Sequence, residues 1–412
     1  MVRDSKQGCE VVIAGGGMVG LTLGIALAGA GVETVIIDGA DAAQVLDAGF
    51  DGRVSSIAPA SRRMLEVLAL WPDIAPQAEP VLDIVVGDGT VREGASAALL
   101  HFDHRDAGDD PLAHMVENRH FRLAQERRVR GMPGLQVLAP ARVTGVAPTA
   151  SGIAVTTDCG QVVEARLCVA ADGRDSLVRA ACGIKTTGWP YRQHGIVTTV
   201  AHERPHRGVA HEIFLSSGPF AILPMKGNRS SIVWSERDVE AAAFMTLDDA
   251  AFADEVRLRF GDHLGETHLV GPRWSYPLGL QLANSYLAPR VALVGDAAHA
   301  VHPLAGQGLN LGLRDVAALA EAVIDARRLG LDIGLGANLS AYENHRKFDN
   351  ALFALSMDAL NRLFSNDNAG LRAMRRFGLD LVDAIPPLKT FFMRQAGGLS
   401  GPQPRLLRGV DL

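Results

Sequence analysis

Short apolar runs separated by glycines dominate the first 40 positions of the chain. Residues 11–14 (VVIA) form a continuous apolar run, which predicts a buried strand, and residues 15–17 (GGG) interrupt it. Residues 18–30 are small and apolar and predict a helix, after which residues 35–38 (VIID) predict a second buried strand. A strand, glycine turn, helix and strand within about 30 residues is a βαβ unit, which builds a parallel sheet with a right-handed crossover.

The pattern beyond residue 40 predicts further elements of both kinds. Helices are expected at 58–70, 117–130, 248–260, 309–329 and, for the most part, 342–393. Strands are expected at 81–86, 99–103, 135–146, 152–158, 166–170 and 291–294, and as a group of short strands at 196–201, 211–215, 220–223 and 230–234. Dinucleotide-binding elements therefore stand at both ends of the first 345 residues, a mostly antiparallel sheet interrupts them, and a helical tail follows.

Composition excludes several classes of protein. The chain has 412 residues, 48% of them hydrophobic, and a formal net charge of −6 without a basic excess, so no nucleic-acid partner is expected. Its four cysteines have no CxxC spacing and suit reduced thiols rather than zinc or a disulfide framework. Neither an apolar signal core nor a run of 18 apolar residues is present, which favours the cytoplasm.

The first glycine turn carries the strongest local chemistry. Gly15, Gly17 and Gly20 have GxGxxG spacing and lie between the predicted strand and helix. In this fingerprint the first glycine permits the tight turn, the second lets a pyrophosphate approach the backbone, and the third allows close helix–strand packing. Asp38 ends the second strand about 20 residues further on, where a carboxylate binds ribose hydroxyls. The four residues predict a dinucleotide site at the amino end of the helix.

A second strand-end motif follows residues 291–294. Asp296 comes directly after this strand, and a glycine-rich turn at 306–308 opens a long helix. A carboxylate at a strand end can accept a hydrogen bond from a ribityl hydroxyl, and a helix amino end stabilises the negative charge of a reduced flavin. His299 and His302 lack the further ligands that a metal site needs, so no metal is expected, and His299 suits a structural hydrogen bond better than a catalytic base.

These motifs resemble those of a known family. The segment 295–315 (GDAAHAVHPLAGQGLNLGLRD) resembles the second flavin-binding motif of class A FAD-dependent aromatic hydroxylases, and 171–179 (ADGRDSLVR) resembles their middle DG motif. Segments 50–53 (FDGR), 116–119 (VENR) and 342–350 (YENHRKFDN) resemble the ubiquinone-biosynthesis hydroxylases of the UbiH, UbiF and UbiL type. His345, where an arginine is common, and Arg122, at a less charged position, depart from the pattern. The last segment suits either this family signature or a charged helix face.

The resemblance implies an α/β fold with discontinuous domains. It implies a glutathione-reductase-like FAD-binding Rossmann domain, an inserted mostly antiparallel β-sheet substrate domain and a C-terminal helical segment. The expected limits are 8–80, 113–185 and 276–345 for the FAD-binding domain, 81–112 and 186–275 for the substrate domain, and 346–412 for the helical segment.

The resemblance also implies roles for individual residues. The three glycines are expected to bind the FAD pyrophosphate, and Asp38 is expected to bind the adenosine ribose. Asp172 is expected to support the arrangement of FAD and NAD(P)H. Asp296 is expected to bind the ribityl chain. Arg53, Asn118 and Arg119 are expected beside FAD, and Pro303, Gly306, Gly308, Leu309 and Asn310 along the isoalloxazine. The expected lining of the substrate pocket is Phe214, Phe220, Leu223, Pro224 and Met225.

The activity implied is an aromatic-ring monooxygenation. NAD(P)H reduces FAD, O2 then forms a flavin C4a-hydroperoxide, and its electrophilic oxygen enters the ring of a polyprenylated phenol or quinone precursor. The protein must exclude water and position the ring. The sequence assigns no catalytic acid or base.

Other interpretations stay open from sequence alone. One is a class A hydroxylase of a small soluble aromatic, another a flavin-dependent isoprenoid reductase or cyclase, and a third a non-enzymatic escort that binds prenylated partners or accessory proteins. The expected partners of the enzyme are its hydrophobic substrate and either a membrane surface or a ubiquinone-biosynthesis protein complex. The tail mixes basic and apolar residues, which suits contact with the surface of the inner membrane or a helical cap on the FAD domain. The basic ones are Arg372, Arg375, Arg376, Lys389 and Arg394.

Overall fold

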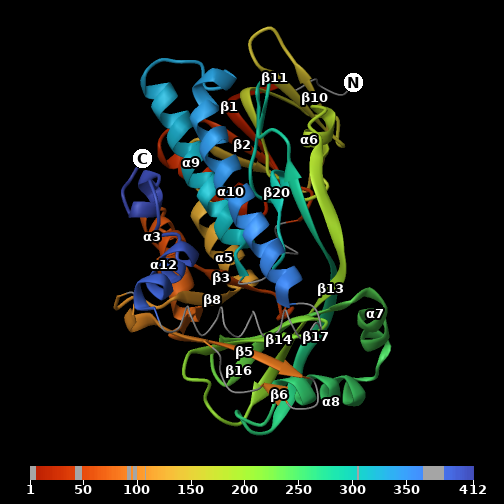
Figure 1. Ribbon diagram of the computed structural model, residues 1–412. Coiled ribbons are helices and arrows are strands. Elements are labelled where there is room, and N and C mark those ends of the chain that lie inside the picture. The colour runs from red at the N-terminus through yellow and green to blue at the C-terminus, as the bar shows by residue number, and fades with distance from the viewer. Residues whose placement is uncertain are drawn as a thin grey trace.

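A mixed eight-stranded sheet, referred to as the parallel sheet after its parallel central strands, forms the upper part of the molecule in Figure 1. The structure is a computed structural model that describes residues 6–41, 49–90, 94–95, 100–106, 108–303, 306–364 and 385–412. The sheet has the order β10-β11-β12-β1-β2-β9, and β19 and β18 are added beside β12. Its strands are β1 (Lys6–Ala14), β2 (Thr34–Ile37), β9 (Leu135–Leu138), β10 (Val143–Pro148), β11 (Ile153–Thr157), β12 (Val162–Ala170), β18 (Leu287–Ala288) and β19 (Val291–Leu293).

The predicted βαβ unit is confirmed. Strand β1 pairs in parallel with β2 and with β12, so that Val11 lies opposite both Thr34 and Leu167. Helix α1 (Met18–Gly29) connects β1 and β2 and is buried along nearly its whole length, which its small apolar residues allow. At Gly24 a side chain would collide with Ile36 of β2, 2.5 Å from an ideal Cβ, so glycine lets the helix lie close to the sheet.

The single strand predicted at 135–146 is wrong. The structure has two strands there, and they lie at opposite edges of the sheet, since β9 pairs with β2 whereas β10 pairs with β11. Pro140 lies in the connection, where its missing N–H and fixed φ suit a turn rather than a continuing strand.

A nine-stranded sheet reaches from the upper part of the molecule, where β20 lies, into its lower part (Figure 1). Its order is β20-β17-β13-β16-β15-β14-β5-β6, with β7 beside β5. The strands are β5 (Asp83–Thr90), β6 (Gly94–Ala95), β7 (Leu100–Asp103), β13 (Thr186–His202), β14 (Val209–Leu215), β15 (Gly218–Met225), β16 (Arg229–Arg237), β17 (Thr267–Ala283) and β20 (His299–Ala300). Only the β14–β5 pair is parallel among the described pairs of this sheet, so the predicted mostly antiparallel character is confirmed.

The two faces of this sheet differ in what covers them. One face carries Trp234, which is fully buried with Phe252 and Phe260 beneath α7 (Asp238–Thr246) and α8 (Asp249–Phe260). The other face packs against α10 (Gly336–Phe364) and against a small sheet of β3 (Val54–Ile57), β8 (Ala113–Glu117) and β4 (Glu79–Val81). This second face therefore points toward the elements of the parallel sheet.

Long helices complete the molecule. Helix α9 (Gly308–Arg328) is largely buried, α10 packs beside it, and α12 (Pro386–Ala396) follows near the C-terminus (Figure 1). The domain limits stay a prediction; β17 runs through the expected limit at 275/276 and α10 through that at 345/346. Of the basic tail residues, Arg372, Arg375 and Arg376 lie outside the described residues. None of the described helices has the length and apolar character to cross a bilayer.

Candidate functional site

Four sequence motifs meet at one edge of the parallel sheet. Strands β19, β12, β1 and β2 are neighbours in this order, and all three pairs are parallel, so their carboxyl ends share an edge. The residues that follow these strands are those around Asp296, Asp172, Gly15 and Asp38, respectively. Ligands of open α/β sheets bind at this edge, so the structure brings the predicted binding residues to the expected place.

The glycine turn has a backbone that only glycine fits. Gly15 has φ +102°, and an ideal Cβ on it would lie 2.3 Å from the carbonyl oxygen of Ala171. A Cβ on Gly20 would lie 2.0 Å from the carbonyl oxygen of Gly15. Around Gly17, at the amino end of α1, no described residue beyond the adjoining backbone has an atom within 4 Å of that position. The first and third glycines thus serve close packing, and the second leaves the helix end open to a ligand.

Arg122 belongs to this site, although the sequence indicated only that it departs from the family pattern. It lies on α5 (Asn118–Val129), where its guanidinium donates a hydrogen bond to the carbonyl oxygen of Gly16 and lies 3.8 Å from the Asp38 carboxylate. Its Nε is buried without a hydrogen-bond partner in the described part of the chain. The side chain thus places a positive charge beside the glycine turn. Its helical spacing from Asn118, four residues, is the signal that could have indicated this.

The DG motif lies directly beside the glycine turn. One carboxylate oxygen of Asp172 accepts a hydrogen bond from the backbone N–H of Val178 at 3.1 Å. The other, Oδ1, is buried and has no hydrogen-bond partner among the described residues. Buried polar atoms are seldom left unpaired in folded proteins, so this oxygen marks a position where a ligand donor fits. Arg179 connects the motif to the next one, because it donates to the carbonyl oxygen of Ala297 at 2.9 Å.

Asp296 lies just after β19, in a short 3-10 turn. Its side chain is exposed, and it makes no hydrogen bond or ion pair within the described ranges. Protein nevertheless surrounds it closely enough that desolvation raises the pKa of its carboxyl, although the charges of His299 and Arg174 oppose this. An accessible carboxylate with protein on most sides suits a group that faces a bound ligand.

A buried carboxylate holds this turn in place. Asp315 of α9 accepts hydrogen bonds from the Gly295 N–H at 3.0 Å, from Arg346 Nε at 2.9 Å and from the His299 ring. Burial raises the pKa of Asp315, but the charges and hydrogen bonds of His299 and Arg346 outweigh it and lower the pKa to about 2. His299 is therefore a structural partner of the turn, as expected.

The segment 342–350 is not a plain charged helix face. Arg346 and Asn350 are buried, and Asn350 donates hydrogen bonds to Asp315 Oδ1 and to the Tyr286 hydroxyl, each at 3.2 Å. The Tyr342 hydroxyl donates to the carbonyl oxygen of Leu293, the last residue of β19. The segment 342–350 thus supports β19 and the turn that contains Asp296. His345, its departure from the family pattern, is exposed.

Comparison with known proteins agrees with this geometry. The sequence profile of a family described as FAD binding domain matches residues 8–328. The chain is 50% identical over 406 residues to the ubiquinone hydroxylase UbiL of Rhodospirillum rubrum, across 98% of this chain and 93% of that protein. It is 31% identical over 397 residues to the 3-demethoxyubiquinol 3-hydroxylase of Escherichia coli, across 96% of this chain and all of that protein (100%).

The chain belongs to the FAD-dependent ubiquinone-biosynthesis hydroxylase family. Its cofactor is FAD and it is a flavoprotein monooxygenase, so the family that its motifs resemble is confirmed. The fold class is confirmed as well: the solved structure of p-nitrophenol 4-monooxygenase from Pseudomonas putida superposes with a TM-score of 0.80 at 20% identity, across 96% of this chain and 100% of that one.

The remaining residues predicted beside FAD have mixed surroundings. Asn118 accepts a hydrogen bond from Ser55 at 2.7 Å, and its N–H donates to the carbonyl oxygen of Arg53. Arg53 itself is exposed and forms an ion pair with Asp51, whereas Arg119 pairs with Glu117. Contact of these side chains with FAD stays a prediction.

The turn before α9 combines an open backbone with a fixed side chain. Gly306 has φ +61°, its N–H donates to the carbonyl oxygen of Pro303, and Gly308 has open space where a side chain would lie. Asn310 is fully buried and joins α9 to β3, since its amide donates to Ser56 O and accepts from Ala58 N–H, both at 2.9 Å. Leu309 is half-buried. Asn310 therefore positions the turn, and contact of this turn with the isoalloxazine stays a prediction.

The predicted substrate-pocket residues divide between the two faces of the nine-stranded sheet. Phe214 and Leu223 lie on the face toward the parallel sheet. Phe220 is fully buried on the opposite face, with Trp234. Because side chains alternate along β15, Pro224 lies on the same face as Phe220, whereas Met225 lies on the same face as Leu223. The face toward the FAD-binding elements thus keeps three of the five candidates.

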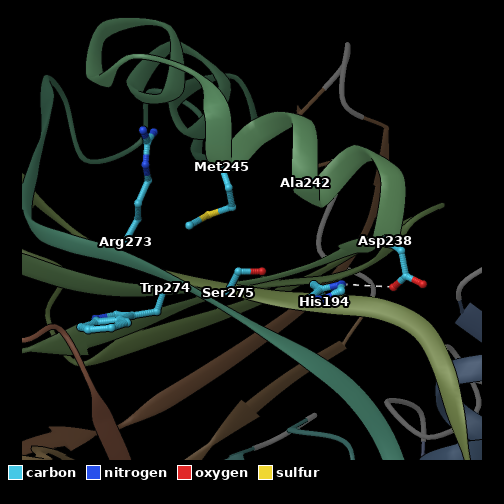
Figure 2. Close-up of a pocket in the computed structure, with 7 residues that line it drawn as sticks. All are labelled: His194, Asp238, Ala242, Met245, Arg273, Trp274 and Ser275. Atoms are coloured by element: carbon cyan, nitrogen blue, oxygen red, sulfur yellow. Dashed lines mark hydrogen bonds and ion pairs between the residues drawn. The ribbon is translucent and has the colours of Figure 1, made fainter.

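A cavity of about 450 Å³ lies elsewhere, beneath α7 (Figure 2). Its lining includes Met245, Arg273 and a hydrogen-bonded pair, His194 and Asp238, whose atoms Nδ1 and Oδ1 are 3.1 Å apart. None of its lining residues belongs to the four strand-end motifs. It is therefore separate from the flavin site.

Asp296→Ala should weaken FAD binding about 10- to 100-fold, because a hydrogen bond to a charged group contributes roughly 1.5–3 kcal/mol. Asp296→Asn should bind FAD more tightly than the alanine variant, since its amide oxygen still accepts. Reconstitution of apo-protein, followed by flavin fluorescence quenching, measures both. Asp254→Ala, at an exposed position of α8, is the control. Wild-type affinity in the alanine variant would show that Asp296 does not contact the cofactor.

Proposed function

We propose that this enzyme hydroxylates the aromatic ring of a polyprenylated phenol or quinone precursor in ubiquinone biosynthesis, with NAD(P)H and O2 as co-substrates. The observation that carries the proposal is the 50% identity, over 98% of the chain, to a protein named as a ubiquinone hydroxylase. Bound FAD would supply the activation of O2, and one oxygen atom would enter the ring while the other leaves as water.

The residues present fit FAD. The open position at Gly17, the unpaired Asp172 Oδ1 and the accessible Asp296 lie along one sheet edge, in the order that the family motifs require. Arg122 adds a positive charge beside the amino end of α1, where the pyrophosphate would lie. These residues would bind and orient the cofactor; the chain itself assigns no proton transfer to them.

The substrate side of the site is apolar. Val86, Leu100 and Phe214 form a buried cluster on the face of the nine-stranded sheet toward α10, and Met357 and Leu360 of α10 pack against it. Such a surface would suit a hydrophobic ring and would exclude water from the reacting carbon. A hydrophobic substrate is consistent with it.

The test of this function is the mass of the product. Purified holoenzyme with NAD(P)H, 18O-labelled O2 and a short-chain prenylated phenol in detergent should yield a product that gains one labelled oxygen atom. A product without labelled oxygen would contradict hydroxylation: an unchanged mass or a loss of two hydrogen atoms would favour cyclisation, and a gain of two hydrogen atoms would favour reduction. Higher kcat/KM for a small soluble phenol than for the prenylated one would contradict the proposed substrate class.

We propose further that the enzyme rests on a membrane surface through α10. Phe348, Leu352 and Leu355 lie on one side of this helix at spacings of four and three residues, and they are 71%, 50% and 54% exposed. Large exposed apolar side chains in one stripe are typical of contact surfaces. Phe391 and Phe392 of α12 are also exposed and add to the apolar surface near the C-terminus. A membrane that holds the polyprenyl substrate is the partner that this chemistry fits.

Replacing Phe348, Leu352 and Leu355 together by Gln should remove most binding to vesicles that contain anionic phospholipid, because each large side chain loses roughly 1.5–3 kcal/mol of burial. Flotation of the holoenzyme with vesicles measures it. The control is a triple Gln variant at Val239 of α7, Leu258 of α8 and Leu329, which directly follows α9; all three are also exposed. Equal flotation of the two variants would contradict this surface.

A further inference from the structure

Glu212 is a carboxylic acid in the middle of the apolar face described above. It lies on β14, directly between Val86 of β5 and Ala221 of β15 in the strand register. Because side chains alternate along a strand, Glu212 shares its face with Ala210 and Phe214. Both neighbours belong to buried apolar clusters, one with residues of β8 and one with residues of α10. Glu212 therefore points between these clusters, toward the FAD-binding elements.

The Glu212 carboxyl has no partner in the described part of the chain. It makes no hydrogen bond and no ion pair there, and the residue is half-buried rather than enclosed. Burial alone raises the pKa of Glu212 to about 7, without a contribution from any neighbouring charge. An unpaired carboxyl in apolar surroundings costs stability, and such groups concentrate at functional sites.

Other glutamates near this sheet are held by structural contacts. Glu117 pairs with Arg119 and Arg229, at 2.6 and 2.9 Å. Glu236 accepts hydrogen bonds from the Trp234 ring and from the Arg237 N–H. Ion pairs explain why Glu117 is charged and buried, and hydrogen bonds explain the burial of Glu236. Neither kind of contact explains the position of Glu212.

We infer that Glu212 is a catalytic residue that binds the hydroxyl group of the phenolic substrate and accepts its proton. The inference rests on the proposed function and names the group that the sequence left unassigned. The apolar clusters on both sides would hold the ring, and the carboxylate would be the polar group that fixes its orientation.

The proton transfer balances without a further reactant. The phenol O–H bond breaks and a carboxyl O–H bond forms on Glu212, while the electron pair stays on the phenol oxygen and conjugates into the ring. The ring carbon thereby becomes more nucleophilic toward the electrophilic oxygen that the family reaction supplies. When that carbon loses its hydrogen to water, the electron pair returns to the ring, and the proton on Glu212 returns to the phenol oxygen.

Two substitutions separate binding from proton transfer. Glu212→Met removes both the hydrogen-bond acceptor and the base at similar volume, whereas Glu212→Gln keeps an acceptor and loses the base. Both should fold and retain FAD, because they remove a desolvated carboxyl that has no partner. Glu266→Gln, at an exposed position before β17, is the control.

The binding readout compares a short-chain prenylated phenol with its methyl ether, titrated against the oxidised holoenzyme and followed by the flavin spectrum. Wild type should bind the phenol at least about 10-fold more tightly than the ether, as expected for a hydrogen bond to a carboxylate. In Glu212→Met this preference should fall to within about threefold. Glu212→Gln should keep part of the preference, but its rate of product formation should fall by about 100-fold or more, the usual contribution of a general base.

Wild-type preference and rate in Glu212→Met, with full FAD content, would overturn the inference. Failure of the proposed function has a different signature, because the wild-type enzyme itself would then give no oxygenated product from the prenylated phenol. A loss of preference in Glu266→Gln equal to that in Glu212→Met would also overturn the role of Glu212.

Discussion

The buried carboxylate of Asp315 connects the segments on which the site depends. It receives hydrogen bonds from the Gly295 backbone, the His299 ring and the Arg346 guanidinium, and the side chains of Asp315, His299 and Arg346 are almost fully buried. A buried charge of this kind is costly unless it is fully paired. Pairing is achieved here only if α9, α10 and the turn after β19 are all in place. The position of Asp296, and with it the sheet edge proposed to bind FAD, therefore depends on this one group.

A second constraint separates polar from apolar chemistry. The edge of the parallel sheet presents carboxylates, open helix ends and the Arg122 charge, which suit a charged and hydroxyl-rich cofactor. The nine-stranded sheet presents an apolar face, interrupted by Glu212, which suits a greasy aromatic substrate. Strands β13 and β17 extend between the upper and lower parts of the molecule (Figure 1), so the two kinds of surface are held in one frame.

Local patterns were enough to predict much of this arrangement. The βαβ unit, the mostly antiparallel sheet and the strand-end acids could be predicted because a short stretch of sequence contains the pattern that indicates each of them. The face of the sheet on which a strand residue lies could not be predicted. Phe214 and Phe220 look equivalent in sequence, yet strand register places them on opposite sides of the sheet. The partners of Asp315 also come from three separate segments, and the long-range pairing of Arg346 with it leaves no local pattern.

If Asp315 holds the Gly295–Asp296 turn in place, loss of its charge should weaken FAD binding. The most direct measurement is the FAD affinity of Asp315→Asn apo-protein, taken at a temperature where circular dichroism shows the variant folded. The control is Glu321→Gln, which breaks a more exposed ion pair of the same helix, with Arg405. Asp315→Asn should lose at least about tenfold in FAD affinity, equivalent to about 1.4 kcal/mol, while the control stays near wild type. Wild-type FAD affinity in folded Asp315→Asn would contradict it.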